Sequence, residues 1–195
     1  MVAAVAAAMS ALLILAIDQP VARWLARYEP LAVWDRGIEA LEYGVLLPLH
    51  RLALPVVLVL GMIVTVSVPR LRAHAPAWML LASTQLVCRL AMIWCKEATG
   101  RLRPTEWLMR GAPDETFGWV GGISFPSGHV VLFASLLVPL AVVAPRTRPL
   151  LALVGFAMIA RLGVNAHFVS DVVAAITLVA VVTWAMGWLV RPCRR

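Results

Sequence analysis

Two histidines and one carboxylate in the second half of the chain have the residue types and the spacing of a catalytic group. His167 and Asp171 are four residues apart, so they share one face if the following helix begins early enough. The carboxylate would then accept the ring N–H and raise the basicity of the other ring nitrogen, as in a nucleophilic histidine. A purely structural His–Asp pair is the alternative. His129 stands in a separate stretch and can supply a proton donor.

Cationic side chains accompany the histidines. Lys96 is the only lysine of the chain and opens the stretch KEATGRLRP, residues 96–104, which also holds Arg101 and Arg103. A tight basic cluster at the end of an apolar run suits an anionic head group, although a lysine there can also snorkel to the interface. Arg161 lies inside an otherwise apolar run, where an unpaired charge costs at least ~2.5 kcal/mol. Such cations suit a phosphoryl group in transit.

The stretch SFPSGHV, residues 124–130, has the composition of a helix start at the head of a long apolar run. Pro126 and Ser127 are typical of the first residues of a helix, and the serine can cap it. The free N–H groups and the positive dipole end of such a helix form a ready phosphate site, which Gly128 would let an anion approach closely. An ordinary capped helix with an interfacial histidine is the alternative.

The elements that must carry these residues are membrane helices. The chain has 195 residues, of which 62% are hydrophobic, and a mean hydropathy of +0.89. Soluble domains contain about 45–50% apolar residues, and several runs approach the ~20 apolar residues that cross a bilayer. We therefore expect an all-α, polytopic membrane protein with a single domain, residues 1–195. The net charge of +7 lies mostly in short loops, which indicates topology signals and excludes nucleic-acid binding.

Six apolar runs predict a bundle of six transmembrane helices. The first run lacks the positive start and the cleavage site of a signal peptide, so we expect it to be retained. The predicted spans are 2–17, 52–68, 76–95, 128–143, 150–166 and 169–190.

Arginines predict the orientation of this bundle. Arginine pairs within 70–72 and 146–148 follow the second and fourth spans, and further arginines end the chain. With six spans these segments lie on one side, which the positive-inside rule places in the cytoplasm. The longer connections, 18–51 and 96–127, then face outward. Apolar residues three to four apart predict short amphipathic helices on the outer surface within the first of these connections. They are Val21, Trp24, Leu25 and Tyr28, and then Leu31, Trp34, Ile38 and Leu41.

The three polar stretches together resemble the signature of the type 2 phosphatidic acid phosphatase (PAP2) family, membrane lipid phosphatases related to vanadium haloperoxidases. That signature reads K-x6-RP, PSGH and SR-x5-H-x3-D. Here the first motif is residues 96–104, the second is residues 126–129, and the third ends with residues 161–171. Three spaced motifs in order make a specific signal. One position departs, because Ala160 replaces the serine of the third motif, and we expect this to alter only hydrogen bonding around the site.

The resemblance implies a PAP2/haloperoxidase-like core and a role for each matching residue. His167 would be the nucleophile that forms a phosphohistidine, and Asp171 would hold its ring. His129 would protonate the leaving oxygen and later activate water. The phosphoryl oxygens would be bound by Lys96, Arg103, Ser127, Gly128 and Arg161. No metal and no other cofactor is implied, because the cations do the work of a Mg²⁺ ion.

The function implied is hydrolysis of a lipid phosphate or diphosphate, such as undecaprenyl diphosphate, phosphatidylglycerol phosphate or phosphatidate. The small size and short loops favour a bacterial inner-membrane enzyme whose site faces the outside. A phosphotransferase of the same family is the nearest alternative, and it differs in an acceptor pocket that motifs do not reveal. A transporter or channel is disfavoured, because the unusual charges cluster at one surface instead of lining the midplane. The exception is Arg89, which could contact a second phosphate, pair within the bundle or snorkel outward.

Overall fold

The computed structural model describes residues 12–45, 52–112 and 120–190, and within these ranges the regular elements are helices. In chain order they are α2 (Asp18–Leu25), α3 (Ala32–Gly44), α4 (Ala53–Ser67), η1 (Pro69–His74), α5 (Ala75–Thr99), α6 (Pro104–Met109), α7 (Gly128–Val143), η3 (Pro145–Leu150), α8 (Leu151–Gly163) and α9 (Val169–Val190). The expectation of an all-α protein holds for the described residues.

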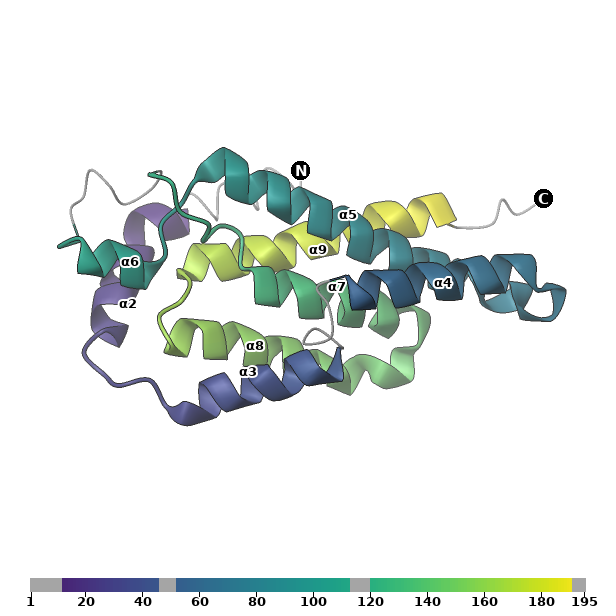
Figure 1. The fold of residues 1–195 in the computed structure, drawn as a ribbon, viewed down its shortest axis with the longest axis horizontal. Coiled ribbons are helices and arrows are strands. Elements are labelled where there is room, and N and C mark those ends of the chain that lie inside the picture. The colour runs from purple at the N-terminus through teal and green to yellow at the C-terminus, as the bar shows by residue number, and fades with distance from the viewer. Residues whose placement is uncertain (1–11, 46–51, 113–119, 191–195) are drawn as a thin grey trace.

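Three helices, α5, α7 and α9, pack against one another at the centre of the bundle (Figure 1). Around them, α4 packs on α5, α8 packs on α7, and α3 lies along α8. α7 is apolar on all sides, as expected of a helix with neighbours around it. The main core joins α7 to α9 and includes Val130, Val131, Ala134, Val172, Ala175 and Val179.

Most helix boundaries agree with the predicted spans. The spans predicted at 128–143 and 169–190 coincide with α7 and α9, and α4 falls within the span predicted at 52–68. The span predicted at 2–17 lies for the most part outside the described residues.

The helices that carry polar residues differ from prediction at their ends. α5 continues past the predicted end at residue 95 up to Thr99, and Gly100 closes it in a left-handed conformation with φ 55°. The charged residue Lys96 therefore lies within the helix and not after it. α8 ends at Gly163 and not at residue 166, and Asn165 follows with a positive φ of 52°.

Two stretches of the described residues are long and apolar enough to cross a membrane. They are Pro69–Met109, which contains α5, and Val169–Val190, which is α9. α4 and α7 are apolar but shorter. α8, with 13 residues, measures ~20 Å against a hydrocarbon core of ~30 Å. The count of six spans stays a prediction.

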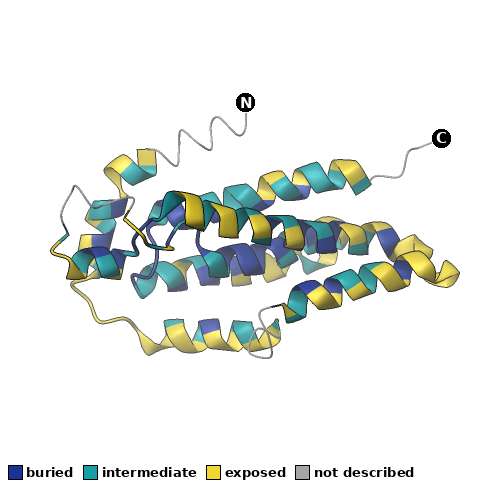
Figure 2. Ribbon diagram, turned by 45° about the horizontal axis from the view of Figure 1, so that its top comes forward, coloured by how far each residue is buried: buried dark blue, intermediate teal, exposed yellow. Residues whose placement is uncertain are grey.

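Exposed residues lie on the outer sides of the helices, whereas the centre of the bundle is buried (Figure 2). Large apolar side chains are among the exposed ones on α4, α5 and α9. They include Val56, Leu60 and Ile63 on α4, Leu86, Leu90 and Trp94 on α5, and Val181, Trp184 and Trp188 on α9. Exposed apolar faces of this extent mark contact with a membrane or another protein.

The two ends of the bundle differ in chemistry. η1 and η3 lie at one end and carry the arginine pairs within 70–72 and 146–148. At the other end α5 and α8 finish, α7 and α9 begin, and α2 and α6 lie beside them (Figure 1). All three polar sequence stretches therefore meet at the end opposite the arginine pairs.

The segment 18–51, which is described up to residue 45, forms two helices as expected. α3 packs on α8 with its predicted apolar face. α2 buries Asp18 and Ala22, whereas Trp24 on the same helix and Tyr28 just after it, both predicted for an apolar face, are exposed. The face that α2 turns into the protein is therefore the one that carries Asp18, which binds a buried arginine.

Candidate active site

The residues predicted for catalysis or phosphate binding come from segments that meet at this end of the bundle. From α5 and the loop after it come Lys96, on the last turn of α5, and Arg103, just before α6. Ser127 directly precedes α7, and Gly128 and His129 are the first residues of α7. Arg161 is on the last turn of α8, His167 lies between α8 and α9, and Asp171 is on the first turn of α9. Arg103 lies close enough to Lys96 and Arg161 for its positive charge to act on both of them. The structure thus brings residues far apart in sequence into one cluster of charge.

The loop after α5 pairs with the loop before α7. The Gly122 N–H donates to the Gly100 carbonyl at 2.7 Å, and the Ser124 N–H donates to the Arg101 carbonyl at 2.8 Å. A Cβ on Gly122 would lie 2.2 Å from the Arg101 carbonyl oxygen, so this close approach requires glycine. The pairing holds the basic loop against the start of α7.

His167 and Asp171 lie together although they do not share a helix face. α9 begins at Val169, so His167 precedes the helix, and the condition for a common helical face, an earlier helix start, is not met. Instead the Asp171 carboxylate turns back over the helix start. Its Oδ2 accepts the Phe168 N–H at 3.0 Å and lies 3.4 Å from His167 Nδ1. This orientation leaves Nε2 of His167 as the nitrogen that can react.

Ser124 is a member of this group that sequence reasoning missed. The side chain is buried, and its hydroxyl donates to Asp171 Oδ2 at 2.6 Å and lies 3.3 Å from His167 Nδ1. The carboxylate oxygen that faces the ring is therefore also held by a hydroxyl. Ser124 opens the SFPSGHV stretch, but its position alone does not separate it from an ordinary loop serine.

Burial lowers the pKa of His167 from 6.5 to about 4, because the protonated ring loses its hydration. The hydrogen bond and the charge of Asp171 raise this pKa, and the positive charges of Arg161 and Lys96 lower it further. The ring is therefore neutral at physiological pH. The neutral ring is the form that can attack phosphorus.

His129 pairs with a residue that sequence reasoning did not single out. Its Nε2 lies 2.6 Å from Oε1 of Glu42 on α3, and the two side chains are 28% and 25% exposed. A carboxylate at this distance interacts favourably with a protonated imidazole, the form that donates a proton. Glu42 lies in a segment predicted only as amphipathic, so spacing carried no signal for it.

Three buried polar atoms of the cluster have no hydrogen-bond partner among the described residues. They are Arg103 Nε, Arg161 Nε and Ser127 Oγ. Ser127 occupies the cap position before α7, but its hydroxyl makes no cap bond, so the expected capping role was wrong. Buried donors are normally satisfied, because leaving one unpaired costs about 1–3 kcal/mol. All three atoms belong to the predicted phosphate-binding set.

Lys96 and Gly128 lie side by side at the start of α7. A Cβ on Gly128 would be 3.8 Å from Lys96 Cε and 3.4 Å from the sulfur of Met92, which are ordinary contact distances. The Lys96 ammonium donates to the carbonyl oxygen of Ile123. The lysine is thus held beside the first turn of a helix, where backbone N–H groups lack helical acceptors.

Arg101 does not face the same site as the other cations, so the predicted shared basic cluster was wrong for this residue. Its guanidinium is buried and donates to Asp18 Oδ2 and Asp171 Oδ1 at 2.7 Å each, and to the Ser170 hydroxyl at 2.6 Å. It also lies over the ring of Phe168, 4.4 Å from the centroid. A buried guanidinium needs anionic partners, and Asp18 was not visible as a neighbour in the sequence.

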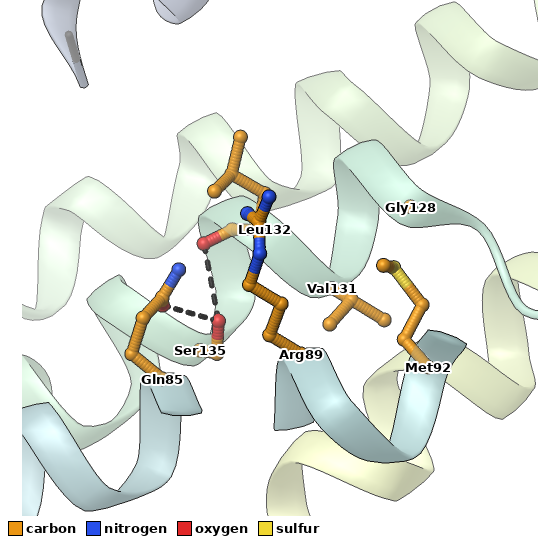
Figure 3. Close-up of a pocket in the computed structure, with 7 residues that line it drawn as sticks. All are labelled: Gln85, Arg89, Met92, Gly128, Val131, Leu132 and Ser135. Carbon is orange, nitrogen blue, oxygen red and sulfur yellow. Dashed lines mark hydrogen bonds between the residues drawn. The ribbon is translucent and has the colours of Figure 1, made fainter. Parts of the chain in front are cut away.

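Arg89 reaches from α5 toward α7 (Figure 3). It lines a small pocket with Gln85, Met92, Gly128, Val131, Leu132 and Ser135. Within this pocket the Ser135 hydroxyl donates to Gln85 Oε1 at 2.5 Å. Because Arg89 points into the bundle, the structure disfavours the outward, snorkelling alternative.

Ala160, the one departure from the motif pattern, is fully buried in an apolar cluster with Ile38, Phe133 and Ala157. An alanine there leaves no polar side-chain atom to satisfy. The departure therefore creates no unpaired group beside the site.

A comparison with family models finds the PAP2 superfamily over residues 76–195, which is more than half of the chain and contains all three motifs. No curated protein and no solved structure matches the chain. The family match confirms the resemblance that the motifs predicted. Members of this superfamily are phosphatases or related phosphoesterases. The chain therefore belongs to the PAP2 superfamily, and phosphatase-type activity is what this membership implies.

Proposed function

We propose that this protein hydrolyses a lipid phosphate or diphosphate through a phosphohistidine on His167. The observation that carries the proposal is the set of buried donors without partners, Arg103 Nε, Arg161 Nε and Ser127 Oγ. Three donors from three segments, beside a neutral histidine, suit a group with several anionic oxygens. A phosphoryl group has this chemistry.

In the first step, Nε2 of His167 attacks phosphorus and the bond from phosphorus to the leaving oxygen breaks. His129 gives its proton to that oxygen, so the lipid leaves as a neutral alcohol or as a monophosphate. The N–H on Nδ1 of His167 stays beside Asp171, whose charge stabilises the ring as it becomes positive.

In the second step, His129 takes a proton from water, and the resulting hydroxide attacks phosphorus. The P–N bond breaks, inorganic phosphate leaves, and His167 returns to its neutral form. Lys96, Arg103 and Arg161 bind the equatorial oxygens in both steps, and the charge that develops on these oxygens is met by fixed cations. The Ser127 hydroxyl and the N–H groups at the start of α7 add neutral donors.

A lipid substrate is supported by the apolar surface. Exposed apolar side chains cover α4, α5 and α9, and exposed tryptophans lie near both ends of these helices: Trp94 near the site, and Trp184 and Trp188 near the opposite end. Tryptophan is enriched at the two interfaces of a membrane. A site at the end of such a bundle lies at head-group depth, where a lipid presents its phosphate.

The orientation follows from the arginine pairs. They lie in η1 and η3, at the end opposite the site. If the positive-inside rule applies, that end faces the cytoplasm and the site faces the outside. We therefore propose an enzyme of envelope lipids in a bacterial inner membrane, with undecaprenyl diphosphate, phosphatidylglycerol phosphate and phosphatidate as candidate substrates.

The proposal is tested by measuring phosphate release from a panel of these lipids in detergent, with EDTA present. We expect release from at least one lipid by the wild type and none by the His167→Ala variant. Transfer of labelled phosphate to a second lipid, without release, would identify a phosphotransferase instead. Activity that EDTA abolishes would refute the metal-independent mechanism.

A further inference from the structure

A buried charge cluster connects the catalytic histidine to helix α2. Asp18, Arg101, Ser170 and Asp171 are each at most 1% exposed. Arg101 donates to both carboxylates at 2.7 Å. Asp18 also accepts the Ser170 N–H at 2.9 Å and the Ser170 hydroxyl. The cluster therefore joins α2, the basic loop after α5 and the first turn of α9.

The cluster fixes the orientation of Asp171. Its Oδ1 is bound by Arg101, and its Oδ2 accepts from Ser124 and from the Phe168 N–H. With both oxygens engaged, the carboxylate cannot rotate away from the His167 ring without breaking a buried, charge-assisted hydrogen bond. Arg101 thus acts on His167 through Asp171.

The cluster also contributes negative charge beside His167, on which the positive charges of Arg161 and Lys96 act as well. With both carboxylates ionised, Asp18 and Asp171 contribute two negative charges and Arg101 one positive charge, so one net negative charge remains. If Arg101 were paired with Asp171 alone, it would cancel most of the negative charge of that carboxylate. Because Asp18 shares the guanidinium, Asp171 keeps a negative potential toward a ring that becomes positive during attack.

Further contacts attach α2 to the loop between α8 and α9, which carries His167. The Asn165 side chain, between α8 and α9, donates to the Ala22 carbonyl at 3.0 Å. Ala22 also packs in an apolar cluster with Leu102, Trp107 and Phe168. The loop that carries His167 is therefore held from the side of α2.

From this geometry we propose that Asp18 and Arg101 are positioning residues for His167 and Asp171. Helix α2 then belongs to the catalytic unit, although it precedes the family-matched residues 76–195. The inference rests on the proposed function, because it takes His167 as the nucleophile. Neither Asp18 nor Arg101 needs to contact the substrate.

The test is the Asp18→Asn variant, which keeps an oxygen that accepts the Ser170 N–H but removes the charge and the oxygen that accepts from Arg101. The rate of phosphohistidine formation from nitrophenyl phosphate is measured as a burst of nitrophenol. We expect this rate to fall about 10- to 100-fold, the range found for groups that orient a metal-binding histidine from outside its first shell. The inhibition constant of inorganic phosphate should change less than about twofold, because the phosphate-binding cations are untouched.

Two further variants test whether the effect is specific to the buried charge cluster. Arg101→Lys keeps the charge but replaces the two guanidinium nitrogens that hold the two carboxylates by a single ammonium, so the burst rate should also fall while phosphate inhibition is kept. Glu39→Gln removes an exposed carboxylate on α3 and should leave both quantities unchanged.

Each outcome decides the question. An unchanged burst rate in Asp18→Asn overturns the inference and leaves His167 as the nucleophile. A loss of phosphate inhibition in parallel with the burst also overturns it, since the charge would then be needed to build the whole site. If Asp18→Asn does not fold, an unchanged burst in Arg101→Lys overturns the inference. If the wild type forms no phosphohistidine, the proposed function fails, and the inference with it.

Discussion

Nε2 of His129 lies 2.6 Å from Oε1 of Glu42, a residue 87 positions earlier in the chain. The contact joins α7, which begins at the predicted phosphate site, to α3, which packs on the outside of α8. A proton donor must be charged before it acts, and a carboxylate in contact with the ring favours the charged form. Glu42 is thus a candidate support for the general acid, from outside the three sequence motifs.

The Glu42→Gln variant should lower activity on substrates whose leaving group needs a proton. At a pair that is a quarter exposed, this contact is worth about 1 kcal/mol, so we expect a loss of about fivefold in kcat on a lipid phosphate. Nitrophenyl phosphate has a leaving group that needs no proton, and its burst should be unaffected. Glu39→Gln on the same helix is the matched control. An equal loss with both substrates would show that Glu42 does not act through His129.

Alanine variants of His167 and His129 should differ in whether the phosphohistidine forms. His167→Ala removes the nucleophile, so activity should fall to background with every substrate. His129→Ala should cost about 10²–10⁴-fold on a lipid phosphate, the range for loss of a general acid. With nitrophenyl phosphate it should give a burst and then stall, because water is no longer activated. Enzyme labelled with ³²P is expected in His129→Ala and not in His167→Ala, and label in His167→Ala would contradict the assignment.

Ser127→Ala should weaken phosphate binding without weakening the fold. A cap serine normally contributes about 0.5–2 kcal/mol to its helix, but the Ser127 hydroxyl makes no cap bond. Competitive inhibition by inorganic phosphate should weaken about tenfold, as expected for a hydrogen bond to a charged group. The matched control is Ser135→Ala on the same helix, where the hydroxyl binds buried Gln85. That variant should unfold at a lower temperature and keep its phosphate inhibition, so the reverse pattern would contradict both assignments.

The positions of the helices were predictable from the sequence, because a long apolar run that must bury its backbone polar groups forms a helix. α7 and α9 coincide with the predicted spans, since a change from polar to apolar residues marks each end. α5 was predicted too short, because the charged residues at its end were interpreted as a loop. In the structure its last turn carries Lys96 to the site, and Gly100 ends it. Hydrophobicity alone does not report where a helix continues into the polar layer.

Site residues that belong to a short sequence motif were predictable, whereas their contacts with residues distant in the sequence were not. His167 and Asp171 were expected to be adjacent, and they are, although through a carboxylate folded over a helix start. The partners Asp18 and Glu42 were not predicted. Nothing in local spacing specifies which distant acid meets which base, because that pairing is decided by how α2 and α3 pack.

The orientation can be checked with two exposed positions at opposite ends of the bundle. Met109 is 80% exposed at the site end, and Leu150 is 42% exposed in η3. In a variant without the native cysteines, Met109→Cys should react with a membrane-impermeant maleimide in intact cells. Leu150→Cys should react only after the cells are opened. The opposite pattern would place the site in the cytoplasm and overturn the outward orientation.

The low pKa of His167 should make the fold less stable in acid. The folded-state pKa is lowered from 6.5 to about 4, so between these values the unfolded chain binds a proton that the folded chain does not. Stability therefore falls as pH falls from about 6.5 to about 4, by about 3 kcal/mol across the window, and is unaffected above it. The measurement is the unfolding temperature in detergent from pH 7 to pH 4, for the wild type and for His167→Gln. The glutamine cannot titrate, so the difference between the two proteins should shrink or reverse as pH falls, since only the wild type carries this penalty. A difference that stays constant over the range would mean that the pKa of the ring is not lowered in the folded state, and it would contradict the burial effect.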